Sequence, residues 1–168
     1  IQQITIGLFA GDRCLISRHA DKSLDIQQYC ELAQKENLLV SPGLLATRIM
    51  RFSVVRYLEA LLAFEPSLTD LEDVMQDKPN DEIMRVLIAY QSRLRKLRRI
   101  FNYHERMIQN LRTDVPQRLI DEDGDIEHAL QDLYERCERL NGLCTMYYEI
   151  CGDLINGYLS LSSHQLNN

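Results

Sequence analysis

Three cysteines at a regular interval form one candidate metal-binding set in this sequence. Cys137, Cys144 and Cys151 recur every seven residues, and cysteine thiolates bind zinc at about 2.3 Å. Seven residues of helix are about 10.5 Å long, so neighbouring thiols of this series are too far apart to share one ion. Because an unpaired cysteine behaves as a small apolar residue, we expect these three to pack on one face of a helix.

A second candidate is the acidic turn at residues 121–125, Asp-Glu-Asp-Gly-Asp. An EF-hand calcium loop has ligands at positions 1, 3 and 5, glycine at position 6 and glutamate at position 12. Here Gly124 follows the second aspartate directly, so the calcium pattern fails. The residues are typical of a polar turn, and Asp125 is predicted to be the N-cap of the helix that follows.

No motif points to catalysis. Zinc ligands on a helix are commonly three or four residues apart, and no histidine has this spacing to another histidine or cysteine. The sequence contains no glycine-rich phosphate loop and no nucleophile-elbow motif. We therefore predict that the chain is not an enzyme. The histidines considered are His19, His104, His128 and His164.

Residues 93–99 form a basic run, with five arginines or lysines in seven positions. Such a run could bind phosphates, which leaves a nucleic-acid-binding helical hairpin as one alternative. However, Leu94 and Leu97 keep the spacing of a core face, and no aromatic residues interleave for base stacking. We expect a solvated helix face, or one paired with the acidic residues between positions 70 and 77, and no nucleic-acid partner.

The composition indicates an ordinary folded protein. The chain has 168 residues, of which 45% are hydrophobic and 26% charged, and its net charge is -6. Five cysteines, an odd number without a CxxC pair, favour a reducing compartment. A membrane span needs roughly 20 apolar residues. The nearest candidate, residues 54–64, is short and carries Arg56 and Glu59, so no span is expected here.

The sequence predicts a mixed α+β fold that is mainly α. Residues 3–8 and 13–18 are β-prone and flank a turn, which is the pattern of a hairpin. An amphipathic helix is expected over residues 24–36, and Ser41-Pro42-Gly43 marks a break. A lone hairpin is marginally stable, so we interpret residues 1–40 as the C-terminal part of a small α/β subdomain.

Long helices account for the rest of the chain. One is expected over about residues 44–76, with Pro66 kinking or breaking it, and another over 81–112. Since a short turn joins them, the domain at 44–112 is predicted to be an antiparallel helix pair. Apolar residues of the second helix should share one face: Ile83, Leu87, Tyr90, Leu94, Leu97, Phe101, Ile108 and Leu111.

The last predicted helix, over residues 125–168, carries a sustained heptad pattern. Five heptads of this kind indicate a seam for a partner helix, either in the same chain or in another copy. This heptad face consists of Ile126, Leu130, Leu133, Cys137, Leu140, Cys144, Tyr147, Cys151, Leu154, Tyr158 and Leu161. No Gly or Pro closes the helix at Asn168, so we expect it to continue into a further segment.

Several stretches resemble the CorA family of magnesium and cobalt transporters. Residues 130–136 (Leu-Gln-Asp-Leu-Tyr-Glu-Arg) and 157–167 are similar to the family's stalk helix, and the second stretch resembles its "YLS-x-x-S-x-x-x-N" run before the first membrane helix. Residues 5–9 and 15–19 resemble the last hairpin of its cytosolic domain. Residues 57–79 and 94–99 resemble its paired helices. The Gly-Met-Asn pore signature does not occur among these residues.

The resemblance implies a cytoplasmic regulatory and gating domain of a divalent cation channel that carries Mg²⁺ or Co²⁺. It further implies a homopentamer, a place on the cytoplasmic side of the inner (plasma) membrane, missing C-terminal membrane helices, and regulatory Mg²⁺ at the protomer boundaries. Residues 125–168 would form the stalk that leads to the first transmembrane helix. A domain of the ZntB-like zinc transporters and a helical scaffold or adaptor that uses the heptad face remain as alternatives.

Asp132 is the candidate metal ligand, because it aligns with the stalk-helix carboxylate of the family at this boundary. Taken alone, it would be a solvated aspartate near a helix start. The partner acids are expected upstream of Ile1. The family often has aspartates in the helix before Tyr57, whereas this chain has Arg51 and Arg56 there. We therefore expect no second metal site on that helix, with Arg51 as a fixed positive charge in place of the ion.

Overall fold

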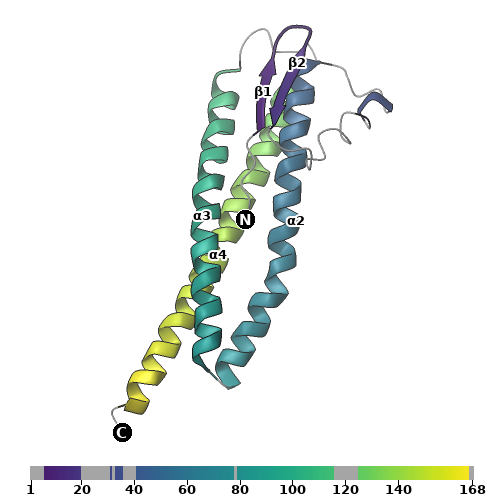
Figure 1. The fold of residues 1–168 in the computed structure, drawn as a ribbon. Helices are drawn as coiled ribbons and strands as arrows, with labels where there is room; N and C mark the ends of the chain where they lie inside the picture. The colour runs from purple at the N-terminus through teal and green to yellow at the C-terminus, as the bar shows by residue number, and fades with distance from the viewer. Residues whose placement is uncertain are drawn as a thin grey trace. The chain divides into compact units, whose positions relative to one another are not determined.

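A computed structural model describes residues 6–19, 31, 33–35, 41–77, 79–115 and 125–166. Its elements, in chain order, are the strands β1 (Ile6–Ala10) and β2 (Leu15–His19) and the long helices α2, α3 and α4. The chain forms two compact units, one of Ile1–Val55 with Glu105–Arg136 and one of Arg56–His104 with Cys137–Asn168. Each long helix contributes to both units. Figure 1 gives the labels used below.

The predicted hairpin is confirmed and lies in the first unit. β1 (Ile6–Ala10) and β2 (Leu15–His19) pair antiparallel, with Ile6 opposite His19 and Ala10 opposite Leu15. Gly11 donates its backbone N–H to the Cys14 carbonyl at 2.8 Å, which closes the turn between the strands. β2 begins two residues later than its β-prone run, and residues 3–5 of the other run lie outside the described residues. Of the helix expected over 24–36, Glu31 and residues 33–35 are described and are helical, and Ala33 is fully buried.

Helix α2 (Pro42–Asp77) begins two residues earlier than predicted. The hydroxyl Oγ of Ser41 accepts a hydrogen bond from the Leu44 amide at 3.1 Å, and the Ser41 carbonyl accepts one from the Leu45 amide at 3.0 Å. Ser41 is therefore the N-cap, and Pro42 occupies the first helical position, where its missing N–H costs nothing. Ser41 and Pro42, which were predicted to lie at a break in the chain, therefore form the start of α2.

Pro66 was predicted to kink or break this helix, and it does not break it, because α2 continues through it to Asp77. Pro66 lies on an exposed face, so the carbonyl one turn before it, which loses its amide donor, faces the solvent side. The opposite face is held by packing within the second unit. The ring of Phe64 lies 4.9 Å from that of Tyr90 and 5.8 Å from that of Tyr147, both edge to face, and Leu68 is buried. Tertiary contacts outweigh the local preference here.

Helix α3 (Asp81–Thr113) matches its predicted range to within one residue. The side-chain Oδ1 of Asn80 accepts hydrogen bonds from the amides of Glu82 and Ile83, each at 3.0 Å, so Asn80 caps the helix. In the second unit, α3 returns antiparallel to α2 (Figure 1). The predicted apolar face is confirmed, since its most buried members are Ile83, Leu87, Leu94, Phe101 and Ile108.

Helix α4 (Asp125–Leu166) carries the heptad face, and that face is buried from Ile126 to Cys151. Beyond Cys151 the face is half-buried at Leu154 and Tyr158, and Leu161 has 54% of its surface accessible. Asp125 is the first helical residue rather than the residue before it, so its carboxylate lies in the first turn, where negative charge is favourable. With the hairpin followed by long helices, the predicted α+β, mainly α fold is confirmed.

Candidate functional site

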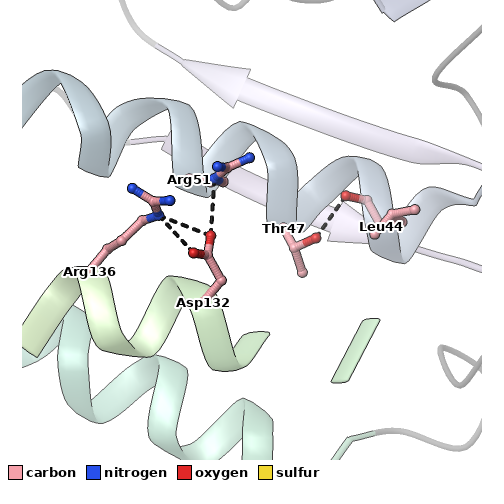
Figure 2. A network of polar contacts seen from close by, with 5 residues as sticks. All are labelled: Leu44, Thr47, Arg51, Asp132 and Arg136. Atoms are coloured by element: carbon pink, nitrogen blue, oxygen red, sulfur yellow. Dashed lines mark hydrogen bonds and ion pairs between the residues drawn. The ribbon is translucent and has the colours of Figure 1, made fainter. Parts of the chain in front are cut away.

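Asp132, the predicted metal ligand, lies at the centre of a small charged cluster in the first unit (Figure 2). Arg136 places Nε 2.9 Å from Oδ2 and 3.1 Å from Oδ1 of this carboxylate. Arg51 reaches across from α2 and places its Nε 3.0 Å from Oδ2. We call these three residues the Asp132 cluster. One carboxylate therefore faces two guanidinium groups.

The backbone of the two helices fixes this cluster. Asp132 and Arg136 are four residues apart on α4, the spacing at which side chains of one helix meet. Leu133, between them in sequence, is fully buried, whereas Asp132 and Arg136 are partly exposed. On α2, Thr47 is buried, and its hydroxyl donates to the Leu44 carbonyl at 2.8 Å. Arg51 follows one turn further along α2 and contacts Asp132.

Apolar packing in the first unit holds the start of α2 near the start of α4. Leu44, Ile126 and Leu130 form a buried cluster. Two partly buried residues pack against it, Leu111 near the end of α3 and Val115 just beyond that helix. Because these contacts lie a turn or two from Arg51 and Asp132, the ion pair forms at the edge of a core and not on an isolated surface.

The charges in the cluster reinforce each other. The hydrogen bond from Arg136 lowers the pKa of Asp132, burial opposes this effect, and the positive charges of Arg136 and Arg51 lower the pKa further. The same hydrogen bond raises the pKa of Arg136. The side chains of Arg51, Asp132 and Arg136 are 53%, 42% and 31% exposed, so the cluster is open to ions and water.

Asp132 can serve as one oxygen ligand for a divalent cation. Mg²⁺ keeps several of its waters and needs only one or two carboxylates, and an accessible, ionised aspartate meets that requirement. Among the described residues, however, no group of three or more acids, histidines or cysteines is close enough to hold a metal. Asp132 therefore does not belong to a group of three or more such ligands in the described part of the chain.

The comparison with known families decides what kind of chain this is. The model of the CorA-like Mg2+ transporter protein family matches residues 1–168, the whole sequence. The chain belongs to this family. It is a family of transporters, and not one of enzymes.

Comparison with solved structures supports the same fold. The chain is similar to the CorA magnesium transporter from Methanocaldococcus jannaschii, with a TM-score of 0.76 and 16% sequence identity. The similarity covers 98% of this CorA-like chain and 57% of the archaeal one. The chain therefore spans little more than half the length of that transporter. No curated protein sequence matches it. Within the described ranges, no helix is both apolar enough and long enough for a bilayer span.

The three cysteines of this CorA-like chain are packing residues, as predicted. Cys137, Cys144 and Cys151 have at most 1% of their surface exposed. The thiol of Cys144 donates to the Leu94 carbonyl at 3.3 Å. Burial raises the pKa of Cys144 and of Cys151 to about 11, so both thiols stay protonated and are poor metal ligands at neutral pH.

The basic run is in contact with α4. Arg95 and Arg98 place their guanidinium carbons 5.8 and 4.9 Å from the ring centre of Tyr148, and Arg95 also donates to the Tyr148 hydroxyl at 3.4 Å. Leu94 is buried, as its spacing predicted. The partner found for these two arginines is thus an aromatic ring instead of the acids between 70 and 77. Of the acidic turn, residues 121–124 lie outside the described residues.

Sequence reasoning missed a polar network beside the Asp132 cluster. Arg112, at the end of α3, donates to the side-chain oxygen of Gln131, and its guanidinium lies over the ring of Tyr134, 4.5 Å from its centre. Gln131 in turn donates to Glu135 at 2.6 Å. The four-residue spacing of Gln131 and Glu135 was a readable signal. The partnership with Arg112 was not, because it joins two helices.

Proposed function

We propose that this chain is the cytoplasmic regulatory and gating part of a CorA-type channel for Mg²⁺ or Co²⁺. The observation that carries the proposal is the family match over all 168 residues. In this proposal the whole protein is a homopentamer in the inner (plasma) membrane, with these residues on the cytoplasmic side. Residues 1–40 belong to an α/β subdomain, 44–112 form the helix pair, and 125–168 form the stalk that joins the membrane part.

The course of the heptad face favours the channel over a scaffold or adaptor. An adaptor would present an apolar seam to a partner protein. Here the seam is buried from Ile126 to Cys151 within a single chain, in part by Phe64 of α2 and Leu94 of α3. Within the described part of α4, the large apolar side chains that are more than half exposed are Leu159 and Leu161, in its last turns.

Asp132 is proposed as a ligand of the regulatory cation at a protomer boundary. Bound there, a divalent cation would supply positive charge that screens facing carboxylates and favours one arrangement of the subunits. Asp132 itself contributes an ionised, accessible oxygen whose direction is set by Arg136 on its own helix. Leu133 and the buried face of α4 make this part of the helix rigid, so a change in the charge state at Asp132 would act on the helix as a whole.

The test is cation flux through the full-length protein encoded by the gene, reconstituted in liposomes. We expect Mg²⁺ entry that is suppressed when Mg²⁺ is raised on the side of this domain, and weaker suppression in Asp132→Asn. Asp153→Asn, which neutralises an exposed acid further along α4, is the matched control and should behave as the wild type. Absence of any divalent flux would refute the channel, and flux of Zn²⁺ alone would support the ZntB-like alternative. Unchanged suppression in Asp132→Asn would remove Asp132 from the site.

A further inference from the structure

Asp132 already holds a positive charge from another helix. Arg51 of α2 lies 3.0 Å from Oδ2 of Asp132, in direct ion-pair contact. A divalent cation bound to the same oxygen would stand within a few ångströms of that guanidinium, and two positive charges at such a distance repel each other strongly. The cation and Arg51 therefore compete for one oxygen.

Arg136 plays a different part from Arg51. It belongs to the same helix as Asp132, four residues on, and its Nε contacts both carboxylate oxygens. Its contact with Asp132 does not depend on the position of α2, so it orients the carboxylate from within α4. Arg51 contacts only Oδ2 and is the member of the cluster that arrives from another helix. With 53% of its side chain exposed, it is also free to swing into solvent when a stronger cation arrives.

We propose that Arg51 is a tethered counter-cation of Asp132, which a divalent cation must displace, and that Arg51 thereby sets how tightly Asp132 binds that cation. The inference rests on the proposed role of Asp132 as a cation ligand. With Arg51 in place, two guanidinium groups contact the carboxylate at low divalent concentration, and it binds the ion only when the ion is abundant. Without Arg51, Arg136 remains as its one guanidinium contact in the cluster, and the carboxylate would respond at lower concentrations.

The experiment compares Mg²⁺ binding to the full-length protein and its variants in detergent by calorimetric titration with MgCl₂, with Mn²⁺ and electron paramagnetic resonance as a second probe. Arg51→Gln removes the competing charge and keeps much of the side chain's bulk. We expect its dissociation constant for Mg²⁺ to be about tenfold lower than that of the wild type, a change of about 1.4 kcal/mol. Arg51→Lys keeps the charge and should stay close to the wild type.

Two controls make the result specific. Arg106→Gln removes an equal charge from an exposed position of α3 in the same unit, and Arg106 is not among the charges that act on Asp132. It should leave the affinity unchanged. Adding Asp132→Asn to Arg51→Gln should abolish the gained binding. Circular dichroism of each variant verifies that the helices are retained.

Each outcome bears on one of the two proposals. If Arg51→Gln and the wild type bind Mg²⁺ equally, and both lose binding with Asp132→Asn, the competition is refuted while Asp132 remains a ligand. If Arg51→Gln shows no binding that depends on Asp132, the ligand role and the competition fall together. If Arg106→Gln tightens binding as much as Arg51→Gln does, the effect is one of net charge, and the specific role of Arg51 is refuted.

Discussion

Replacing Tyr147 by phenylalanine should stabilise this protein, an unusual direction for a core substitution. Tyr147 has 1% of its surface exposed, and its hydroxyl has no hydrogen-bond partner among the described residues. Burial raises the pKa of Tyr147, and the nearby Glu65 carboxylate raises it further through its negative charge and a side-chain hydrogen-bond interaction, although the two groups do not meet the geometry of a hydrogen bond. Tyr147→Phe removes this oxygen and keeps the ring, whose centre lies 5.8 Å from that of Phe64.

The expected size follows from two opposing effects. Burying a hydroxyl without a partner costs roughly 1–3 kcal/mol relative to leaving it in water. Deleting one oxygen leaves a small void, which costs on the order of 0.3 kcal/mol at about 24 cal/mol per Å³. The edge-to-face contact with Phe64 and the aromatic packing are unchanged by the substitution. We expect the free energy of unfolding to rise by about 1 kcal/mol.

Urea denaturation followed by circular dichroism measures this change, and the neighbouring residue supplies the control. The Tyr148 hydroxyl accepts a hydrogen bond from Arg95 at 3.4 Å in an exposed setting, so Tyr148→Phe should change the free energy of unfolding by less than about 0.5 kcal/mol. A similar dependence of the unfolding free energy on urea concentration in the wild type and both variants would show that the unfolding reaction is the same. If Tyr147→Phe is less stable than the wild type, the hydroxyl has a partner in solution and the reasoning is wrong.

Two further predictions concern a helix cap and the buried thiols. Asn80→Ala removes the acceptor of two amide hydrogen bonds at the start of α3. It should lower the free energy of unfolding by about 1 kcal/mol, measured by thermal unfolding, whereas Asn80→Ser should keep most of the stability that the cap provides. Folding raises the pKa of Cys144 and of Cys151 from 9.0 to about 11. The contribution of these protonated thiols to the free energy of unfolding is therefore fully present below pH 9. This contribution is lost as the pH rises toward 11, on the order of 2 kcal/mol per thiol. Urea titrations at pH 7 and 10.5 measure the loss, and an equal pH slope in a Cys144→Ala/Cys151→Ala variant would contradict it.

Helix α4 and the start of α3 could be predicted because their signals are local or periodic. Cys137, Cys144 and Cys151 follow the heptad spacing, and all three are buried where that spacing places them. Asn80 precedes an acidic first turn, which is the usual sequence signature of a helix start, and it caps α3. Periodicity of this kind depends only on helix geometry, so the buried face can be predicted without knowing what it packs against.

Helix α2 shows where local signals mislead. Proline destabilises a helix interior by about 3 kcal/mol, yet α2 runs through Pro66. The residues on either side, Phe64 and Leu68, pack against the other helices of the second unit, and this burial offsets the local cost. A reading of residues near position 66 alone contains none of those contacts. The same holds for Ser41 and Pro42, which mark a loop or a helix start equally well until the hydrogen bond to Leu44 is known.

The candidate site divides in the same way. The i,i+4 spacing of Asp132 and Arg136 is visible in the sequence and predicts their ion pair. The contact of Arg51 with Asp132 is not, because no periodic rule relates a residue of α2 to one of α4. The sequence indicated only that an arginine stands where related proteins often have an acid. The structure adds that this arginine meets Asp132 itself, at 3.0 Å.

That contact changes what a regulatory cation could do at this position. A lone carboxylate at a subunit boundary is repelled by other acids until an ion arrives, so the ion contributes the whole of the attraction. Asp132 is already neutralised by Arg51 and Arg136, and the ion can contribute only the difference between its own binding and that of the displaced guanidinium. A ligand shifts a conformational equilibrium only by its differential affinity for the two states. In the proposed cation site, the response at Asp132 would therefore be governed by whether the arrangement of α2 and α4 that the cation favours also separates Arg51 from this carboxylate.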